Sequence, residues 1–117
     1  MKPKVIKIGI ASQSEIRARV LAIASGVLKP KPSDPKIWFT SIQSLAQVLS
    51  DQNRDLLRVI RESRPKSISA LAQMTGRRQG NLSRTLKTMS SYGLVAMERD
   101  RRALRPKVLA DHYQIMV

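Results

Sequence analysis

The chain has no cysteine, a single histidine and few aromatic side chains: one Trp, two Tyr and one Phe. Without cysteine it can form neither a disulfide nor a thiolate metal site. A zinc site needs about four ligands, and His112 has no other His or Cys to complete one. The five glycines are scattered, so no glycine-rich loop is present to hold phosphates. We therefore expect a protein that is not an enzyme and has no cofactor or metal.

Long apolar runs are also missing. No run approaches the ~20 residues of a membrane span, and the first residues carry charge without an apolar segment and a cleavage site after it. Together with the absence of cysteine, this favours a cytoplasmic protein with no membrane partner. The 117 residues are 42% hydrophobic, enough for one domain with a small appendage and a mainly aliphatic core.

Acidic residues are scarce. Lys and Arg number 22 against 8 acids, a net charge of +14, which implies a polyanionic partner, either nucleic acid or a membrane surface. No acid occurs from Ser63 to Met97, whereas that stretch holds Arg64, Lys66, Arg77, Arg78, Arg84 and Lys87. An ordinary solvated helix mixes both signs. A surface that approaches phosphates excludes carboxylates, so nucleic acid is favoured.

Residues 67–76 predict a short helix followed by a tight turn. Ile68, Leu71 and Ala72 fall at i, i+3 and i+4, one face of a helix. Ser67 suits the N-cap, because its hydroxyl can accept from an orphan amide. Gly76 can take the positive φ that a helix C-terminus favours.

A second helix is predicted to follow and to end at Gly93. Leu82, Leu86 and Met89 lie on one face at i, i+4 and i+7. The opposite face carries Arg77, Gly80, Arg84, Lys87 and Thr88, with Asn81 at its edge. Any two amphipathic helices joined by a glycine turn would show this periodicity. The acid-free face favours a helix-turn-helix whose second helix enters the major groove.

This stretch resembles the winged-helix regulators related to MarR proteins. Their pattern is matched by Leu71-Ala72, Gly76, Leu82-Ser83-Arg84, Leu86 and Gly93-Leu94-Val95. More narrowly, the chain resembles short DNA-binding antitoxins of toxin–antitoxin pairs, a likeness that extends to Trp38-Phe39-Thr40-Ser41, Asn53 to Leu57 and Arg105-Pro106. Arg78 departs from the broader family, which often has a Ser N-cap there. The resemblance implies a winged fold and an autorepressing antitoxin.

Residues 94–109 predict a hairpin. Two apolar-rich strands flank Arg99-Asp100-Arg101-Arg102, and Pro106 cannot donate to a ladder, so the second strand is an edge there. A basic tip beside a recognition helix suits a minor groove, whose negative potential attracts arginine. The alternative is a solvated hairpin.

The first part of the chain predicts a strand–helix extension and a linker. Residues 4–10 alternate with period two and are β-branched, as in a strand. Ser12 and Glu15 form a capping box for a helix running to about Gly26. Its apolar stripe, which serves either as core or as a dimer seam, comprises Ile16, Val20, Ile23 and Val27. Residues 29–35 hold three prolines and read as a stiff connector or as a basic arm on phosphates.

Two further helices are predicted between the linker and the helix-turn-helix. Thr40 and Gln43 form a second capping box, for a helix that packs Ile42, Leu45, Ala46 and Leu49. Ser50-Asp51 begins the next helix, whose inner face carries Leu56, Leu57 and Ile60. Trp38 is either core or a base-stacking platform. Residues 113–117 predict a last strand, which pairs with the N-terminal one in the same chain or in a partner.

We therefore expect an α+β fold, a winged helix-turn-helix with an N-terminal strand–helix extension. The expected domains are residues 1–35 for the extension and the Pro-rich linker, and residues 36–117 for the DNA-binding domain. Two copies would bind an inverted repeat as a homodimer, with the 16–27 stripe and the terminal strands as candidate interfaces.

The predicted function is sequence-specific binding of double-stranded DNA, with repression of the protein's own promoter and a small toxin as a second partner. Gln79, Asn81, Ser83 and Arg84 would reach base edges. Arg77, Arg78, Lys87, Arg102 and Lys107 would mainly grip phosphates, with Arg99 and Arg101 beside them at the wing. The alternatives are a transcription factor without a toxin, or a module that neutralises a small toxin with DNA binding secondary. RNA binding is disfavoured by the 3% aromatic content, because stacking platforms are scarce.

Overall fold

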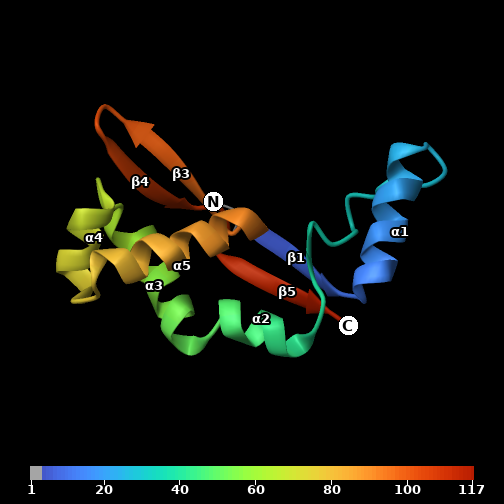
Figure 1. The fold of residues 1–117 in the computed structure, drawn as a ribbon, viewed down its shortest axis with the longest axis horizontal. Coiled ribbons are helices and arrows are strands. Elements are labelled where there is room, and N and C mark those ends of the chain that lie inside the picture. Colours follow the sequence, from blue (N-terminus) through green and yellow to red (C-terminus); the bar gives the residue numbers. More distant parts are fainter. Residues whose placement is uncertain (1–3) are drawn as a thin grey trace. The chain divides into compact units, whose positions relative to one another are not determined.

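The computed structural model describes residues 4–117 (Figure 1). Within this range it has five α-helices and five β-strands, so the fold is mixed α+β, as predicted. The chain forms two compact units: unit 1 holds the described residues up to Gln47 together with Ala110–Val117, and unit 2 is Val48–Leu109. No helix in residues 4–117 combines the length and the apolar character needed to cross a membrane.

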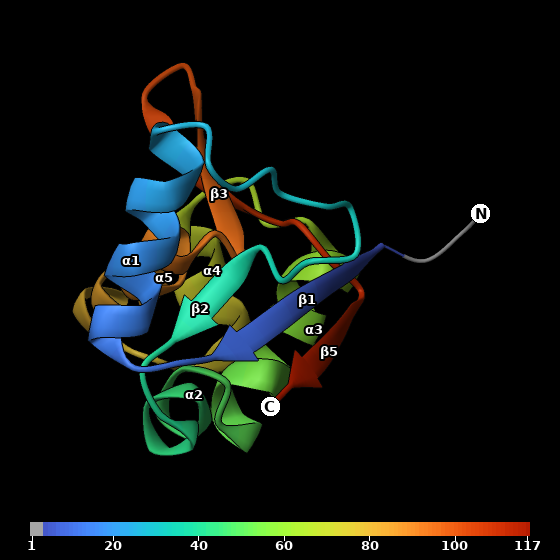
Figure 2. The same ribbon diagram turned by 90° about the vertical axis from the view of Figure 1, so that its right-hand side faces the viewer.

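Unit 1 is built on a three-stranded parallel sheet. Its strands are β1 (Val5–Ile10), β2 (Ile37–Phe39) and β5 (His112–Met116), in the order β2-β1-β5 (Figure 2). The strand predicted at residues 4–10 is confirmed, and the last strand pairs with it within the same chain. Ile8 of the central strand is fully buried.

The two units do not divide the chain at the expected boundary between residues 35 and 36. The reason is that β2, which follows the linker, pairs with β1. The C-terminal strand β5 also returns to β1, so unit 1 contains both ends of the described chain.

Helix α1 (Gln13–Ala24) connects β1 to β2. The Ser12 hydroxyl accepts from the Glu15 N–H at 3.2 Å and donates to the Glu15 carboxylate at 3.0 Å. The predicted cap is therefore confirmed, except that Glu15 meets the hydroxyl of Ser12 rather than its backbone amide. No residue of α1 is buried, and Val20 is 58% exposed. The apolar stripe of this helix thus does not build the core.

Helix α2 (Ile42–Val48) begins one residue later than predicted. Its cap joins Ser41 and Ser44: the Ser44 N–H donates to the Ser41 hydroxyl at 3.0 Å, and the Ser41 N–H donates to the Ser44 hydroxyl at 3.3 Å. The expected box of Thr40 and Gln43 was wrong, because the adjacent Ser41 offers an equivalent hydroxyl. Of the predicted inner face only Leu45 is buried, and Ile42 is exposed.

Unit 2 contains three helices followed by a hairpin. The elements are α3 (Asp51–Ser63), α4 (Ile68–Thr75), α5 (Gln79–Tyr92), β3 (Val95–Asp100) and β4 (Ala103–Val108). Strands β3 and β4 pair antiparallel. The buried apolar side chains are Leu56, Leu57, Ile60, Leu71, Leu82, Leu86, Met89, Leu94 and Val95. The inner faces predicted for α3 and α5 are confirmed.

The ends of these helices follow from local chemistry. Ser50 accepts from the Asn53 N–H at 3.2 Å, and Ser67 accepts from the Ala70 N–H at 3.0 Å. Gly76 and Gly93 end α4 and α5 with φ of 73° and 85°. Glycine adopts this left-handed region at no steric cost, so each predicted helix end is confirmed.

Candidate nucleic-acid interface

Helix α5 is divided sharply into a buried and an exposed face. Leu82, Leu86 and Met89 are at most 1% exposed, which fixes how the helix is rotated against unit 2. We call its exposed side the α5 outer face: it comprises Gln79, Gly80, Asn81, Ser83, Arg84, Lys87 and Thr88, all of them exposed. The four residues predicted to reach base edges therefore share one accessible surface with Lys87.

The charge of the α5 outer face is positive and uncompensated. Among the residues that the structure describes, neither Arg84 nor Lys87 has an ion-pair partner. Helix α3 behaves differently: Arg58 lies 2.7 Å from the Asp55 carboxylate and 3.1 Å from that of Glu62, and the hydrogen bonds that Arg58 donates to Asp55 raise the pKa of Arg58. Helix α3 thus has the mixed charge of a solvated helix, whereas α5 presents cations alone.

The N-terminus of α5 is open. Arg78 occupies the N-cap with φ −68° and ψ 139°, and its side chain makes no capping hydrogen bond. The first turn carries no acid. The orphan amides and the positive end of the helix dipole therefore lack an intrahelical partner there, which is an arrangement suited to an anion. Arg78 itself is exposed beside them.

Gly80 in the first turn of α5 leaves the backbone accessible. A Cβ placed on Gly80 would meet no atom within 4 Å, so packing within the chain does not require glycine there. A backbone without a side chain lets a ligand approach closely.

Arg77 has a structural contact that the sequence did not reveal. Its Nη2 donates to the backbone carbonyl of Gln52 at 2.9 Å, so it joins the turn before α5 to the start of α3. The Arg77 residue is only half-exposed. The guanidinium still has other donors, but its position is set by α3.

The β3–β4 hairpin places three arginines around its tip. Arg99 and Arg102 are exposed, and Arg101 lies in the two-residue turn between the paired residues Asp100 and Ala103. Arg101 has φ 59°, a conformation that is uncommon for a residue with a side chain. In Figure 1, this turn and the first half of α5 both lie toward the left-hand end of unit 2. The structure therefore confirms a hairpin with a basic tip.

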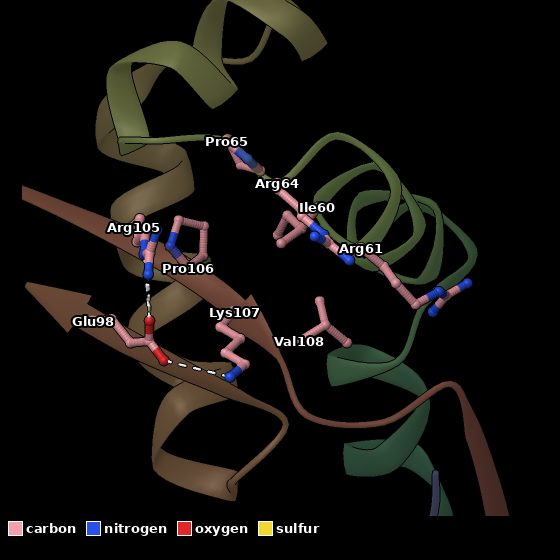
Figure 3. A pocket seen from close by; sticks show the side chains of 9 residues that line it. All are labelled: Ile60, Arg61, Arg64, Pro65, Glu98, Arg105, Pro106, Lys107 and Val108. Carbon is pink, nitrogen blue, oxygen red and sulfur yellow. Dashed lines mark hydrogen bonds and ion pairs between the residues drawn. The ribbon is translucent and has the colours of Figure 1, made fainter. Parts of the chain in front are cut away.

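Lys107 lies on β4, away from the tip, and faces an acid. Its ammonium is 3.7 Å from one oxygen of Glu98, while Arg105 is 3.1 Å from the other (Figure 3). The positive charge of Lys107 is therefore partly neutralised, unlike that of Arg84. Sequence reasoning did not select Arg105, although the register pairs it with Glu98 across the hairpin.

A cavity of about 460 Å³ lies between the end of α3 and the hairpin. Figure 3 shows the residues that line it: Ile60, Arg61, Arg64, Pro65, Glu98, Arg105, Pro106, Lys107 and Val108. The lining combines four apolar residues with four cations and one acid. Sequence reasoning did not find this cavity, because α3 and β4 are about forty residues apart.

No group of three His, Cys, Asp or Glu side chains in residues 4–117 is placed to hold a metal ion. His112 is an exposed residue at the start of β5.

A comparison with known protein families assigns the chain to one of them. Residues 48–115 match the HVO_A0114 family, and since this is more than half of the 117 residues, the chain belongs to that family. The match covers unit 2, which carries the α5 outer face, and extends into β5. The chain matches no curated protein and no solved structure.

Proposed function

We propose that the protein is a DNA-binding transcriptional regulator of the winged helix-turn-helix type, with α4 and α5 as the helix-turn-helix and the β3–β4 hairpin as the wing. The α5 outer face is the observation that supports this most directly. It is exposed, free of acids and without compensating ion pairs, and its helix has an open N-terminus. A helix of this kind suits a major groove.

The side chains of the α5 outer face divide by chemistry into two groups. Gln79, Asn81, Ser83 and Arg84 read bases, since amides and guanidinium pair with adenine and guanine edges. The phosphate contacts come from Arg77, Arg78 and Lys87, together with Arg99, Arg101, Arg102 and Lys107 of the hairpin. Lys107 contributes less charge than the others, because Glu98 partly neutralises it. Arg77 keeps its charge but has one guanidinium donor fewer for a phosphate, because that donor binds the Gln52 carbonyl.

The test is selection of DNA from a random duplex library by the full-length protein, followed by fluorescence anisotropy on the selected and on a scrambled duplex. We expect a specific site to be bound at least about 10³-fold more tightly than the scrambled one. Equal binding of both would leave only non-specific attraction of a +14 chain to a polyanion, and would contradict sequence-specific regulation.

A second function is supported by unit 1. Helix α1 exposes Val20 and Leu21 by 58% and 63%, and Val27 in the turn after it is 83% exposed. Such apolar exposure suits a protein partner. With the resemblance to antitoxins, we propose that a small toxin binds there, that the protein represses the promoter it shares with this toxin, and that both act in the cytoplasm. No cofactor is needed for either role.

The toxin proposal is tested by growth rescue: each neighbouring open reading frame that stops growth when expressed alone is co-expressed with this protein. Leu21→Asp should abolish rescue while leaving operator binding intact, because Leu21 lies outside unit 2. Arg84→Ala is the matched control, which should retain rescue while binding the operator more weakly. Full rescue by Leu21→Asp would move the toxin site elsewhere.

A further inference from the structure

Strand β5 forms one edge of the unit 1 sheet. The order β2-β1-β5 places β1 in the centre and gives β5 a strand partner on one side only, within the described residues. Strand β2 at the opposite edge has three residues, whereas β5 has five. An edge strand presents backbone N–H and C=O groups that can pair with a further strand.

The direction of the outward backbone groups follows from one hydrogen bond. The His112 N–H donates to the Lys4 carbonyl at 3.1 Å, so the backbone of His112 faces β1. Successive residues of a strand direct their N–H and C=O groups to opposite sides, so Gln114 also faces β1. The N–H and C=O of Ile115 are consequently directed to the outer edge.

The edges of unit 2 are protected and the β5 edge is not. Strand β3 ends in Glu98, Arg99 and Asp100, and β4 carries Arg105, Pro106 and Lys107. Charges and proline on edge strands are the usual means of preventing sheet extension. Residues 112–117 contain no Asp, Glu, Lys, Arg or Pro. Of the five strands in the described residues, only β2 and β5 have no charged side chain, and β5 is the longer of the two.

The unit 1 sheet also leaves apolar side chains near this edge in solvent. Ile115 is 49% exposed, Met116 is 41% exposed, and Val5 on the neighbouring strand is 50% exposed. Parallel sheets are normally covered, and sheets of four to six strands are the most common. A three-stranded parallel sheet with an apolar free edge is therefore incomplete by both criteria.

We propose that two copies of this chain associate through β5, with the two β5 strands antiparallel about a two-fold axis, giving one continuous six-stranded sheet. A second copy is the partner that the charges select. An acidic protein would be drawn to the cations of the chain, whereas the neutral β5 edge offers it none. Two copies can meet at β5 without opposing like charges, and antiparallel pairing of identical strands is self-complementary, as a two-fold interface requires.

The sequence left two candidate surfaces for dimerisation, the 16–27 stripe and the terminal strands, and this proposal selects the second. In the predicted 16–27 stripe, Val20 and Val27 are exposed while Ile16 and Ile23 are half-buried. Pairing at β5 adds backbone hydrogen bonds to any side-chain contact. The proposal does not depend on DNA binding, because self-association is measured on the protein alone.

The test is sedimentation velocity of the full-length protein without DNA, from low micromolar to hundreds of micromolar. The wild type should sediment as a dimer at the higher concentrations. Ile115→Lys, which opposes two ammonium groups near the axis, should weaken dimerisation by about tenfold or more. Val20→Lys is the matched control, at an apolar residue on α1 that is 58% exposed against 49% for Ile115, and should change the dimer dissociation constant by less than about twofold.

Amide hydrogen exchange of the wild type provides a readout that does not require any variant to fold. The Ile115 amide should be protected at high concentration and should exchange rapidly on dilution, while the Gln114 amide, which faces β1, should be protected in both conditions. A wild type that stays monomeric at hundreds of micromolar would overturn the proposal. An exchange rate of the Ile115 amide that does not depend on protein concentration would overturn it as well. The same holds for a dimer that Val20→Lys dissociates and Ile115→Lys does not.

Discussion

The indole of Trp38 lies directly against the backbone of Gly9. The two residues are opposite each other on the neighbouring strands β2 and β1, and a Cβ on Gly9 would stand 2.4 Å from Cζ3 of the indole. On Trp38 the guanidinium of Arg19 lies 5.4 Å from the ring centroid, within the range of a cation–π contact. This tryptophan therefore packs against Gly9 and Arg19 within unit 1, although its side chain is only half-buried.

Gly9→Ala should destabilise unit 1. The added Cβ has to displace the indole, and overpacking of this kind lowers the free energy of unfolding by about 1–3 kcal/mol. The measurement is urea unfolding followed by the fluorescence of Trp38, the only tryptophan in the chain. An unchanged midpoint would show that the indole shifts without cost.

Gly80→Ala should have the opposite effect on stability. Its Cβ would enter open space, and alanine in a helix is favoured over glycine by up to about 1 kcal/mol. If the α5 backbone approaches DNA closely, the same variant should bind the selected duplex more weakly. The two readouts are the thermal midpoint followed by circular dichroism and anisotropy. Unchanged affinity would place the helix farther from the groove.

Asp34 should make unit 1 sensitive to acid. The backbone N–H of Lys31 and the guanidinium of Arg19 donate to its carboxylate at 2.8 and 3.0 Å, and they lower its pKa below the usual value of about 3.9. A lowered native pKa stabilises the fold above the usual pKa, and this contribution is lost as the pH falls through the lowered value.

Asp34→Asn keeps an acceptor oxygen but removes the charge. The wild type should therefore be the more stable of the two near neutral pH, and the difference should shrink as the pH falls below about 4. Urea midpoints at a series of pH values measure this difference. A difference that is independent of pH would show that Asp34 acts through hydrogen bonding alone.

Local signals made unit 2 predictable. Ser67, Gly76 and Gly93 fix helix ends through single hydroxyls or backbone conformations, and the buried spacing of Leu82 and Leu86 fixes the rotation of α5. Because the exposed face is what remains, the residues of the α5 outer face could be chosen from the sequence alone.

Long-range pairing made unit 1 harder to predict. The sequence allowed the last strand to pair in the same chain or in a partner, and nothing local indicates that Ile115 lies beside Ile8. The periodicity of α1 showed a stripe but could not show whether anything covers it. The Arg77 contact with Gln52 likewise joins residues twenty-five positions apart.

Arg84 and Lys87 should affect DNA binding differently, although they lie one turn apart on the same helix. Arg84→Ala should cost about 1–3 kcal/mol on the selected site and relax the preference at one base pair, because a bidentate contact to a base edge is lost. Lys87→Ala should weaken binding to all DNA sequences alike and reduce the salt slope of log K by about one unit, since one phosphate contact is lost.

The matched control for both variants is Arg58→Ala on α3, whose charge Asp55 and Glu62 already neutralise. It should leave both the affinity and the salt slope unchanged. The measurement is anisotropy on the selected duplex and its single-base variants across a range of salt concentrations. If Arg84→Ala lowers affinity for every duplex equally, Arg84 holds a phosphate and the reading residues lie elsewhere on the α5 outer face.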